Sequence, residues 1–208
     1  MLQFITHPSS RFTIAEEVKM VIEGGCRWVQ LRLKDLTDDD VRPIAEEIIP
    51  LCKESETILV LDDRVELANA IRVHGVHLGK QDMPVAEARE MLGPHAIIGA
   101  TANTIDDILA LRGIDVDYVG LGPFRFTETK KRLSPVLGLD GYRSIITAKR
   151  NAGIELPVVA IGGITLDDVP AIMATGVDGL AVSGSIITAP DPVAYTAQII
   201  ESIQQSKQ

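Results

Sequence analysis

Short runs of β-branched and aliphatic residues alternate with longer helical stretches along the whole chain, and this alternation restricts the fold more than any other feature. Eight runs are typical of strands: residues 2–6, 28–33, 57–61, 75–78, 96–99, 118–121, 158–161 and 179–182. Between them, apolar residues recur at helical spacing, as at Ile14, Val18, Val21 and Ile22. Because parallel strands need a crossover connection, strand–helix alternation predicts a parallel sheet.

Four Thr-x-x-Asp/Glu segments mark the predicted starts of helices. They pair Thr13 with Glu16, Thr37 with Asp40, Thr104 with Asp107, and Thr165 with Asp168. Each matches a capping box, in which the Thr hydroxyl and the acidic side chain accept hydrogen bonds from backbone N–H groups of the first turn. These boxes fix where the helical stretches begin.

The number of strand–helix units favours a closed barrel. Eight units in 208 residues leave about 26 residues for each, so we predict an α/β fold, a compact (β/α)₈ TIM barrel that forms a single domain over residues 1–208. The alternative is an open doubly wound sheet, which usually carries a Gly-x-Gly-x-x-Gly turn after an early strand; the sequence has no such turn. The long connection at 122–139 is a candidate functional loop.

Composition narrows the classes of function. Lys+Arg 20 and Asp+Glu 29 give a net charge of −9, which argues against a nucleic-acid partner. A hydrophobic content of 46% excludes disorder as the main state, and no apolar run reaches the ~18 residues of a membrane helix. The N-terminus lacks signal-peptide features, and Cys26 and Cys52 have neither metal nor disulfide-framework spacing. We therefore expect a cytoplasmic protein with no membrane partner.

Polar and charged residues follow most of the predicted strands. The active site of such a barrel lies at the carboxyl ends of its strands. The residues expected there are Gln30, Leu31, Arg32, Leu33, Lys34, Asp62, Asp63, Asp82, Thr101, Asn103, Thr127, Glu128, Thr129, Lys130, Gly162, Gly163, Ser183 and Gly184. One end of the molecule should therefore gather carboxylates, cations and glycine-rich turns.

These groups suit phosphorylated small molecules. Asp63 and Asp82 are expected to bind a Mg²⁺ that substrate phosphate oxygens complete. Arg32, Lys34 and Lys130 would neutralise phosphate charge. The turns at 162–163 and 183–184 are typical of loops that hold a second phosphate with backbone N–H groups.

Structural roles are the alternative for several of these residues. Asp63 could cap the helix that begins near Val65, and the acids at 38–40 suit the first turn of a helix. His74 and His77 lie on or beside one strand without a matching second ligand. The basic run at 130–132 also fits a solvated loop.

Six segments together resemble the thiamine-phosphate synthase family. They are 29–34 (VQLRLK), 62–68 (DDRVELA), 75–82 (GVHLGKQD), 117–123 (DYVGLGP), 127–130 (TETK) and 157–164 (PVVAIGGI). The resemblance runs in order from the second predicted strand to about Ile186. The Thr-x-Thr-Lys and His-Leu-Gly-x-x-Asp segments are fairly specific, whereas Ile-Gly-Gly-Ile recurs in many phosphate-binding barrels.

The resemblance implies a transferase of thiamine biosynthesis that joins hydroxymethylpyrimidine diphosphate to a thiazole phosphate and releases pyrophosphate by a dissociative, Mg²⁺-assisted mechanism. Residues 30–34 and Asp62 would bind the pyrimidine diphosphate, with Thr101 and Lys130 on the diphosphate. Thr127, Thr129, Gly163, Ser183 and Gly184 would bind the thiazole phosphate, and Glu128 would be a further substrate-binding residue. Arg32, Lys34 and Lys130 would be catalytic, and Asp63 and Asp82 would bind Mg²⁺. Asp62 replaces a usual Asn and Thr101 a usual Ser.

Three other functions are kept as alternatives. A thiazole tautomerase of the same superfamily would need a His where the chain has Asn103. A non-catalytic thiazole-phosphate binder or regulator would keep the pocket without turnover. A sugar-phosphate isomerase or epimerase would need an acid–base pair that the sequence does not offer. The oligomeric state is left open, with a homo-oligomer as one alternative.

Overall fold

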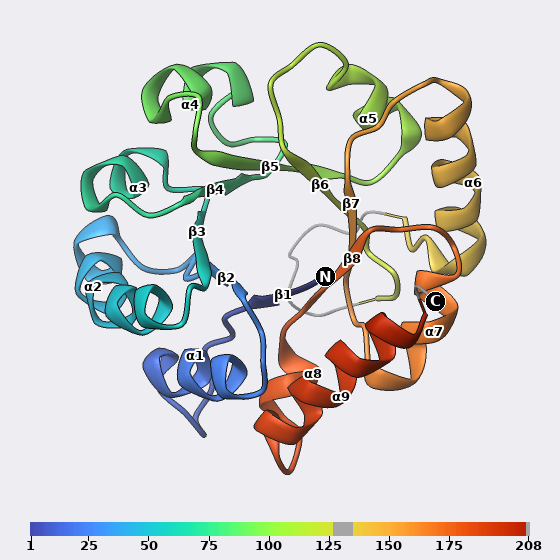
Figure 1. Ribbon diagram of the computed structural model, residues 1–208. Helices are drawn as coiled ribbons and strands as arrows, with labels where there is room; N and C mark the ends of the chain where they lie inside the picture. The colour runs from blue at the N-terminus through green and yellow to red at the C-terminus, as the bar shows by residue number, and fades with distance from the viewer. Residues whose placement is uncertain (127–134, 207–208) are drawn as a thin grey trace.

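The computed structural model describes residues 1–126 and 135–206, and Figure 1 shows them as a closed barrel with helices around it. All strands are parallel and follow one another round the barrel in chain order, with β8 paired to β1. The strands are β1 Leu2–Ile5, β2 Trp28–Leu31, β3 Ile58–Asp62, β4 Gly75–Leu78, β5 Ile97–Ala102, β6 Tyr118–Leu121, β7 Val158–Ile161 and β8 Gly179–Val182. The predicted (β/α)₈ fold is confirmed, and the open sheet is wrong.

The helices form the outer layer of the barrel (Figure 1). They are α1 Ile14–Glu23, α2 Asp38–Glu54, α3 Val65–Ile71, α4 Val85–Leu92, α5 Ile105–Ala110, α6 Gly138–Asn151, α7 Val169–Met173, α8 Gly184–Ile187 and α9 Pro192–Gln205, with a 3₁₀ turn, η1 Leu166–Asp168, before α7. All four predicted capping boxes are confirmed. None of these helices, in the part of the chain that is described, has the length and apolar character needed to cross a membrane.

All eight predicted strands are confirmed, but some of them end at other residues than predicted. Strand β5 runs on to Ala102, beyond the predicted end at 99, because small and polar residues such as Thr101 continue the pairing with β6. Strand β2 stops at Leu31, two residues early, and β3 extends through Asp62. Both changes bring charged side chains directly to the carboxyl ends of the barrel strands.

Two apolar clusters fill the molecule. The larger lies between strands and helices and includes Val29, Leu61 and Leu78. The smaller contains Ile5, Trp28, Tyr118, Val159 and Ala181, residues that alternate along their strands with those of the larger cluster and so face the barrel interior. Trp28 packs edge-to-face on Tyr118 with ring centroids 4.7 Å apart.

Candidate active site

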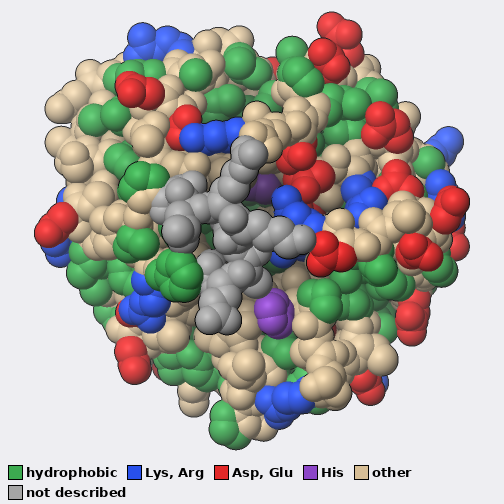
Figure 2. Space-filling model, turned by 180° about the vertical axis from the view of Figure 1, so that it is seen from behind, with side chains coloured by type: hydrophobic (Ala, Val, Ile, Leu, Met, Phe, Trp, Pro, Cys, Tyr) green, Lys and Arg blue, Asp and Glu red, His purple; other side chains and the backbone are tan. Residues whose placement is uncertain are grey.

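Charged side chains from β2, β3 and β4 meet at the carboxyl end of the barrel. The turn after β2 supplies Arg32 and Lys34, β3 ends in Asp62 and is followed by Asp63, and the turn after β4 supplies Asp82. Figure 2 shows acidic and basic side chains close together near the centre of one face. A cleft of about 320 Å³ is lined by Lys34, Asp38, Asp62, Asp63, Arg64 and Glu66.

Asp62 is the buried centre of this cluster. Its Oδ1 accepts a 2.6 Å hydrogen bond from Gln30 Nε2. Its Oδ2 has no hydrogen-bond partner among the described residues, although Arg32 Nε and Lys34 Nζ lie 3.5 and 3.7 Å away. Burial and the neighbouring charge of Asp63 raise the pKa of Asp62 well above its usual range, and the two cations only partly offset this. Asp62 Oδ2 is therefore a buried acceptor that has two ion-pair neighbours and no hydrogen bond among the described residues.

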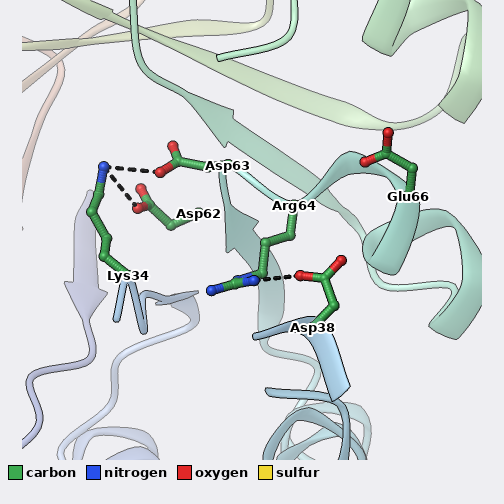
Figure 3. Close-up of a pocket in the computed structure, with 6 residues that line it drawn as sticks. All are labelled: Lys34, Asp38, Asp62, Asp63, Arg64 and Glu66. Atoms are coloured by element: carbon green, nitrogen blue, oxygen red, sulfur yellow. Dashed lines mark hydrogen bonds and ion pairs between the residues drawn. The ribbon is translucent and has the colours of Figure 1, made fainter. Parts of the chain in front are cut away.

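Lys34 lies between two carboxylates (Figure 3). Its Nζ is 2.9 Å from Asp63 Oδ2 and 3.7 Å from Asp62 Oδ2. Burial opposes its charge, but the hydrogen bond to Asp63 and the charges of both aspartates outweigh that effect and raise its pKa. The ammonium group is therefore charged at neutral pH and half-exposed, which suits a phosphate-binding group.

Asp63 and Asp82 face each other across the ends of β3 and β4. Burial and the neighbouring Asp63 carboxyl raise the pKa of Asp82, and Asp82 Oδ2 accepts a hydrogen bond from the N–H of Gly79 at 2.6 Å. Asp63 has φ 66°, a left-handed conformation that is uncommon for a non-glycine residue and often marks a functional site. Helix α3 begins without a side-chain cap, so the alternative role of Asp63 as a helix cap is wrong.

The donor set fits a hard divalent cation. Two carboxylates in contact repel when both are ionised, and a cation between them relieves that repulsion. Mg²⁺ typically takes one or two carboxylates and completes its shell with water and phosphate oxygens. The described residues contain no cluster of three or more His, Cys, Asp or Glu side chains that could hold a metal ion without other ligands.

Thr101 lies next to the carboxylates, on the inner side of β5. Its Oγ1 is 3.0 Å from Nε2 of the buried His77. A second cleft of about 380 Å³ brings Thr101 together with Gly79, Lys80 and Asp82, and the Lys80 ammonium pairs with Asp107 at 2.6 Å. Thr101 and Asp82 thus share one cleft, as predicted from their strand-end positions.

The turns after β7 and β8 are held against each other. Gly162 and Gly163 both have positive φ, 107° and 69°, a conformation that glycine tolerates best. Ser183 precedes α8, and the Ser185 hydroxyl donates a 2.8 Å hydrogen bond to the carbonyl of Ile164. The two predicted phosphate turns are therefore neighbours.

Other predicted residues have structural surroundings. Leu31 and Leu33 pack in the larger core cluster, so only their backbone atoms are available to a ligand. Asn103 is buried and donates through Nδ2 to the carbonyl of Gly122 at 2.6 Å. Thr127, Glu128, Thr129 and Lys130 lie outside the described residues.

The structural alternative for the acids at 38–40 is confirmed. Asp38–Asp40 form the first turn of α2, where Asp40 completes a capping box. Asp38 pairs with Arg64 (Figure 3). The Nη2 of Arg64 also donates to the carbonyls of Leu33 and Leu36. Cys26 and Cys52 are free and buried.

Sequence reasoning missed Arg64 and the inner contacts of His77. Arg64 holds the turn that carries Lys34 by donating to two backbone carbonyls, which no sequence motif identifies. Strand alternation could have found His77, since it lies on the opposite face of β4 from the core residues Val76 and Leu78.

Comparison with known proteins agrees with this geometry. A family model described as thiamine monophosphate synthase matches residues 2–186. Thiamine-phosphate synthases of Bacteroides fragilis and Bacteroides thetaiotaomicron are each 56% identical over 199 residues, covering 96% of this chain and 98% and 95% of theirs. A solved thiamine phosphate pyrophosphorylase from Pyrococcus furiosus is 31% identical, with a TM-score of 0.87 over 100% of this chain and 96% of its own. The chain belongs to the thiamine-phosphate synthase family.

Proposed function

We propose that this chain joins hydroxymethylpyrimidine diphosphate to a thiazole phosphate, forming thiamine phosphate and releasing pyrophosphate. Relatives that align with this chain over almost their whole length are named as this transferase. The single observation that supports it best is the cluster of Lys34, Asp62 and Asp63, in which one cation and two carboxylates line the same cleft.

The diphosphate end of the substrate suits the cationic side of the cluster. Arg32 and Lys34 come from one turn and point toward Asp62, so a diphosphate between them would meet two positive charges. Thr101 would add a hydroxyl donor from β5. Lys130, proposed as a further catalytic cation, lies outside the described residues.

The pyrimidine suits the buried side. Gln30 holds Asp62 in place through Oδ1, which leaves Oδ2 as an acceptor for the exocyclic amine of an aminopyrimidine. Aspartate accepts but, when ionised, does not donate, whereas the Asn that the family usually has at this position does both. The ionised carboxylate would therefore contact the pyrimidine only as an acceptor.

Asp63 and Asp82 would hold Mg²⁺. When bound, the ion supplies positive charge that neutralises the diphosphate as it becomes a leaving group. Lys34, hydrogen-bonded to Asp63, keeps that carboxylate ionised and oriented for the ion. Arg64 orders the turn that holds Lys34 by donating to Leu33 and Leu36.

The chemistry then needs electrostatic stabilisation and no protein nucleophile. The bond between the pyrimidine methylene carbon and the diphosphate oxygen breaks, and its electron pair leaves on oxygen. The resulting pyrimidinylmethyl cation accepts the lone pair of the thiazole nitrogen, which forms the new C–N bond. Arg32 and Lys34 stabilise the charge that develops on the departing oxygen.

The thiazole phosphate is assigned to the turns after β7 and β8. Gly163 and the Ser183-Gly184 turn would present backbone N–H groups to the phosphate, and Ser185 holds the two turns together. Thr127, Glu128 and Thr129 are proposed to complete this site from outside the described residues.

The setting of the enzyme is also a proposal. The free thiols of Cys26 and Cys52 suit a reducing cytoplasm. Small molecules are the proposed partners, and a homo-oligomer stays an open alternative.

The deciding experiment measures thiamine phosphate formation from both purified substrates, once with Mg²⁺ and once with a chelator. We expect product only with the metal. Binding of thiazole phosphate by the folded protein without any product would favour the non-catalytic binder. Isomerisation of a thiazole phosphate in the same assay would favour the tautomerase.

A further inference from the structure

A chain of polar side chains crosses the apolar interior of the barrel beneath the site. Gln3 Nε2 lies 3.1 Å from the Tyr118 hydroxyl, which lies 3.0 Å from His77 Nδ1. On the other side of the imidazole, His77 Nε2 lies 3.0 Å from Thr101 Oγ1. Gln3, His77 and Tyr118 are each less than a tenth exposed, so the chain leads from the closed interior to the cleft.

Two glycines make room for this chain. A Cβ at Gly99 would lie 2.2 Å from Cζ of Tyr118, and a Cβ at Gly120 would lie 2.9 Å from Cε1 of His77. Side chains at either position would displace the rings. The interior strand positions are therefore shaped around the phenol and the imidazole.

Hydrogen-bond counting assigns the protons along the chain. Gln3 Nε2 can only donate, so the Tyr118 oxygen accepts from it. Burial raises the pKa of Tyr118, so the phenol keeps its proton. The nearby acceptor for that proton is His77 Nδ1, since a buried hydroxyl left without an acceptor costs free energy. Since Nδ1 accepts from Tyr118, the ring N–H lies on Nε2 and donates to Thr101 Oγ1, 3.0 Å away.

The tautomer of His77 determines the direction in which the Thr101 hydroxyl donates its proton. A hydroxyl oxygen that accepts from His77 directs its single proton elsewhere, and the second cleft, with Asp82 and Gly79, lies on its open side. With the other tautomer, Thr101 would donate into the barrel and present only lone pairs to an anion. The tautomer of His77 thus decides whether Thr101 attracts or repels a phosphate oxygen.

We propose that Tyr118 and His77 are positioning residues that make Thr101 a hydrogen-bond donor toward the diphosphate. This rests on the proposed function only through the identity of the anion; the relay itself is a property of the barrel interior. Both rings are buried, and each is proposed to act through the Thr101 hydroxyl.

A first experiment measures the relay without any assay of activity. Two-bond ¹H–¹⁵N correlation spectra of protein with labelled histidine report which nitrogen of each ring is protonated. The protein has 4 histidines, and the signal that disappears in His77→Phe is that of His77. We expect only the Nε2–H tautomer of His77 in the wild type. In Tyr118→Phe we expect a mixture of the Nε2–H and Nδ1–H tautomers. An Nδ1–H tautomer or an imidazolium in the wild type would overturn the proposal.

A second experiment links the relay to the anion. Calorimetric titration with magnesium pyrophosphate should show an affinity about tenfold lower in both His77→Phe and Thr101→Val, the size of one hydrogen bond to a charged group. The double variant should lose no more than Thr101→Val alone, because His77 acts through the hydroxyl. Additive losses would contradict the relay and leave His77 with a merely structural role. His74→Gln, on the same chain segment but outside the network, is the matched control.

Kinetics separate this inference from the proposed function. In His77→Phe, the KM for the pyrimidine diphosphate should rise about tenfold while the KM for the thiazole phosphate stays unchanged. A wild type with the expected tautomer and pyrophosphate binding but no thiamine phosphate would refute the function and keep the relay. Normal turnover with an unchanged KM in His77→Phe would keep the function and refute the relay.

Discussion

Lys34 Nζ lies 2.9 Å from Asp63 Oδ2, which makes one ammonium group the link between the cationic turn after β2 and the carboxylates after β3. The same nitrogen is 3.7 Å from Asp62. The lysine therefore has two roles that compete: it balances the charge of the two carboxylates, and it is the cation expected to bind a diphosphate. Substrate binding would shift its hydrogen bonds from carboxylate to phosphate.

Removal of this charge should damage catalysis more than folding. We expect Lys34→Gln to lower kcat/KM by about 10²-fold or more, because the group stabilises charge on the leaving oxygen. Steady-state kinetics with varied pyrimidine diphosphate measures the loss, and urea unfolding checks stability. Lys19→Gln, an exposed lysine of α1, is the control. A change of less than twofold in Lys34→Gln would contradict the assignment.

The carboxylate pair should determine the Mg²⁺ requirement. We expect Asp63→Asn and Asp82→Asn each to raise the Mg²⁺ concentration for half-maximal turnover at least tenfold, since each loses an anionic oxygen ligand. The measurement is a Mg²⁺ titration of activity at fixed substrate concentrations. Asp39→Asn, an exposed acid in the first turn of α2, should leave the titration unchanged. Wild-type Mg²⁺ dependence in both site variants would show that the ion binds elsewhere.

The fold and the position of the site were predictable because both follow from local patterns. Eight strand runs set the barrel, and the barrel brings the residues after its strands to one end. Lys34, Asp63 and Asp82 could be placed together on that basis alone. The pairing of Gln30 with Asp62 was not predictable, because it depends on which side chains are buried after closure.

Long-range contacts account for what the sequence did not reveal. Arg64 orders the 33–36 turn through two carbonyl oxygens, and carbonyl groups carry no residue-type signal. The placement of His77 depends on Gly99 and Gly120, which lie on two other strands. The residues at 127–130 lie outside the described residues, so their assignment to the thiazole phosphate and the diphosphate stays a prediction.

The hydrogen bond between the turns after β7 and β8 should affect the KM of only one substrate. Loss of the Ser185 hydroxyl in Ser185→Ala removes its hydrogen bond to Ile164 and loosens the turns assigned to the thiazole phosphate. We expect the KM for the thiazole phosphate to rise about fivefold, as for one neutral hydrogen bond, with the KM for the pyrimidine diphosphate unchanged. Ser206→Ala, which removes a similar bond in α9, is the control. Equal effects on both substrates would argue against this division of the site.

Glu17 should make stability depend on pH. The residue is fully buried in α1, its Oε2 accepts from the N–H of His7, and its Oε1 has no hydrogen-bond partner among the described residues. Burial raises the pKa of Glu17 from 4.5 to about 7. Between these values the folded state binds a proton that the unfolded state has lost, so a rise in pH favours unfolding.

The contribution of protonated Glu17 to the unfolding free energy is fully present below about pH 4.5 and is lost as the pH rises through about 7. The shift corresponds to roughly 3 kcal/mol of unfolding free energy as an upper bound. Glu17→Gln keeps the shape and removes the titration. We therefore expect the unfolding free energy of the wild type, measured in urea from pH 4.5 to pH 8, to fall relative to that of Glu17→Gln by about 2–3 kcal/mol. Parallel curves for the two proteins would show that Glu17 does not titrate in this range.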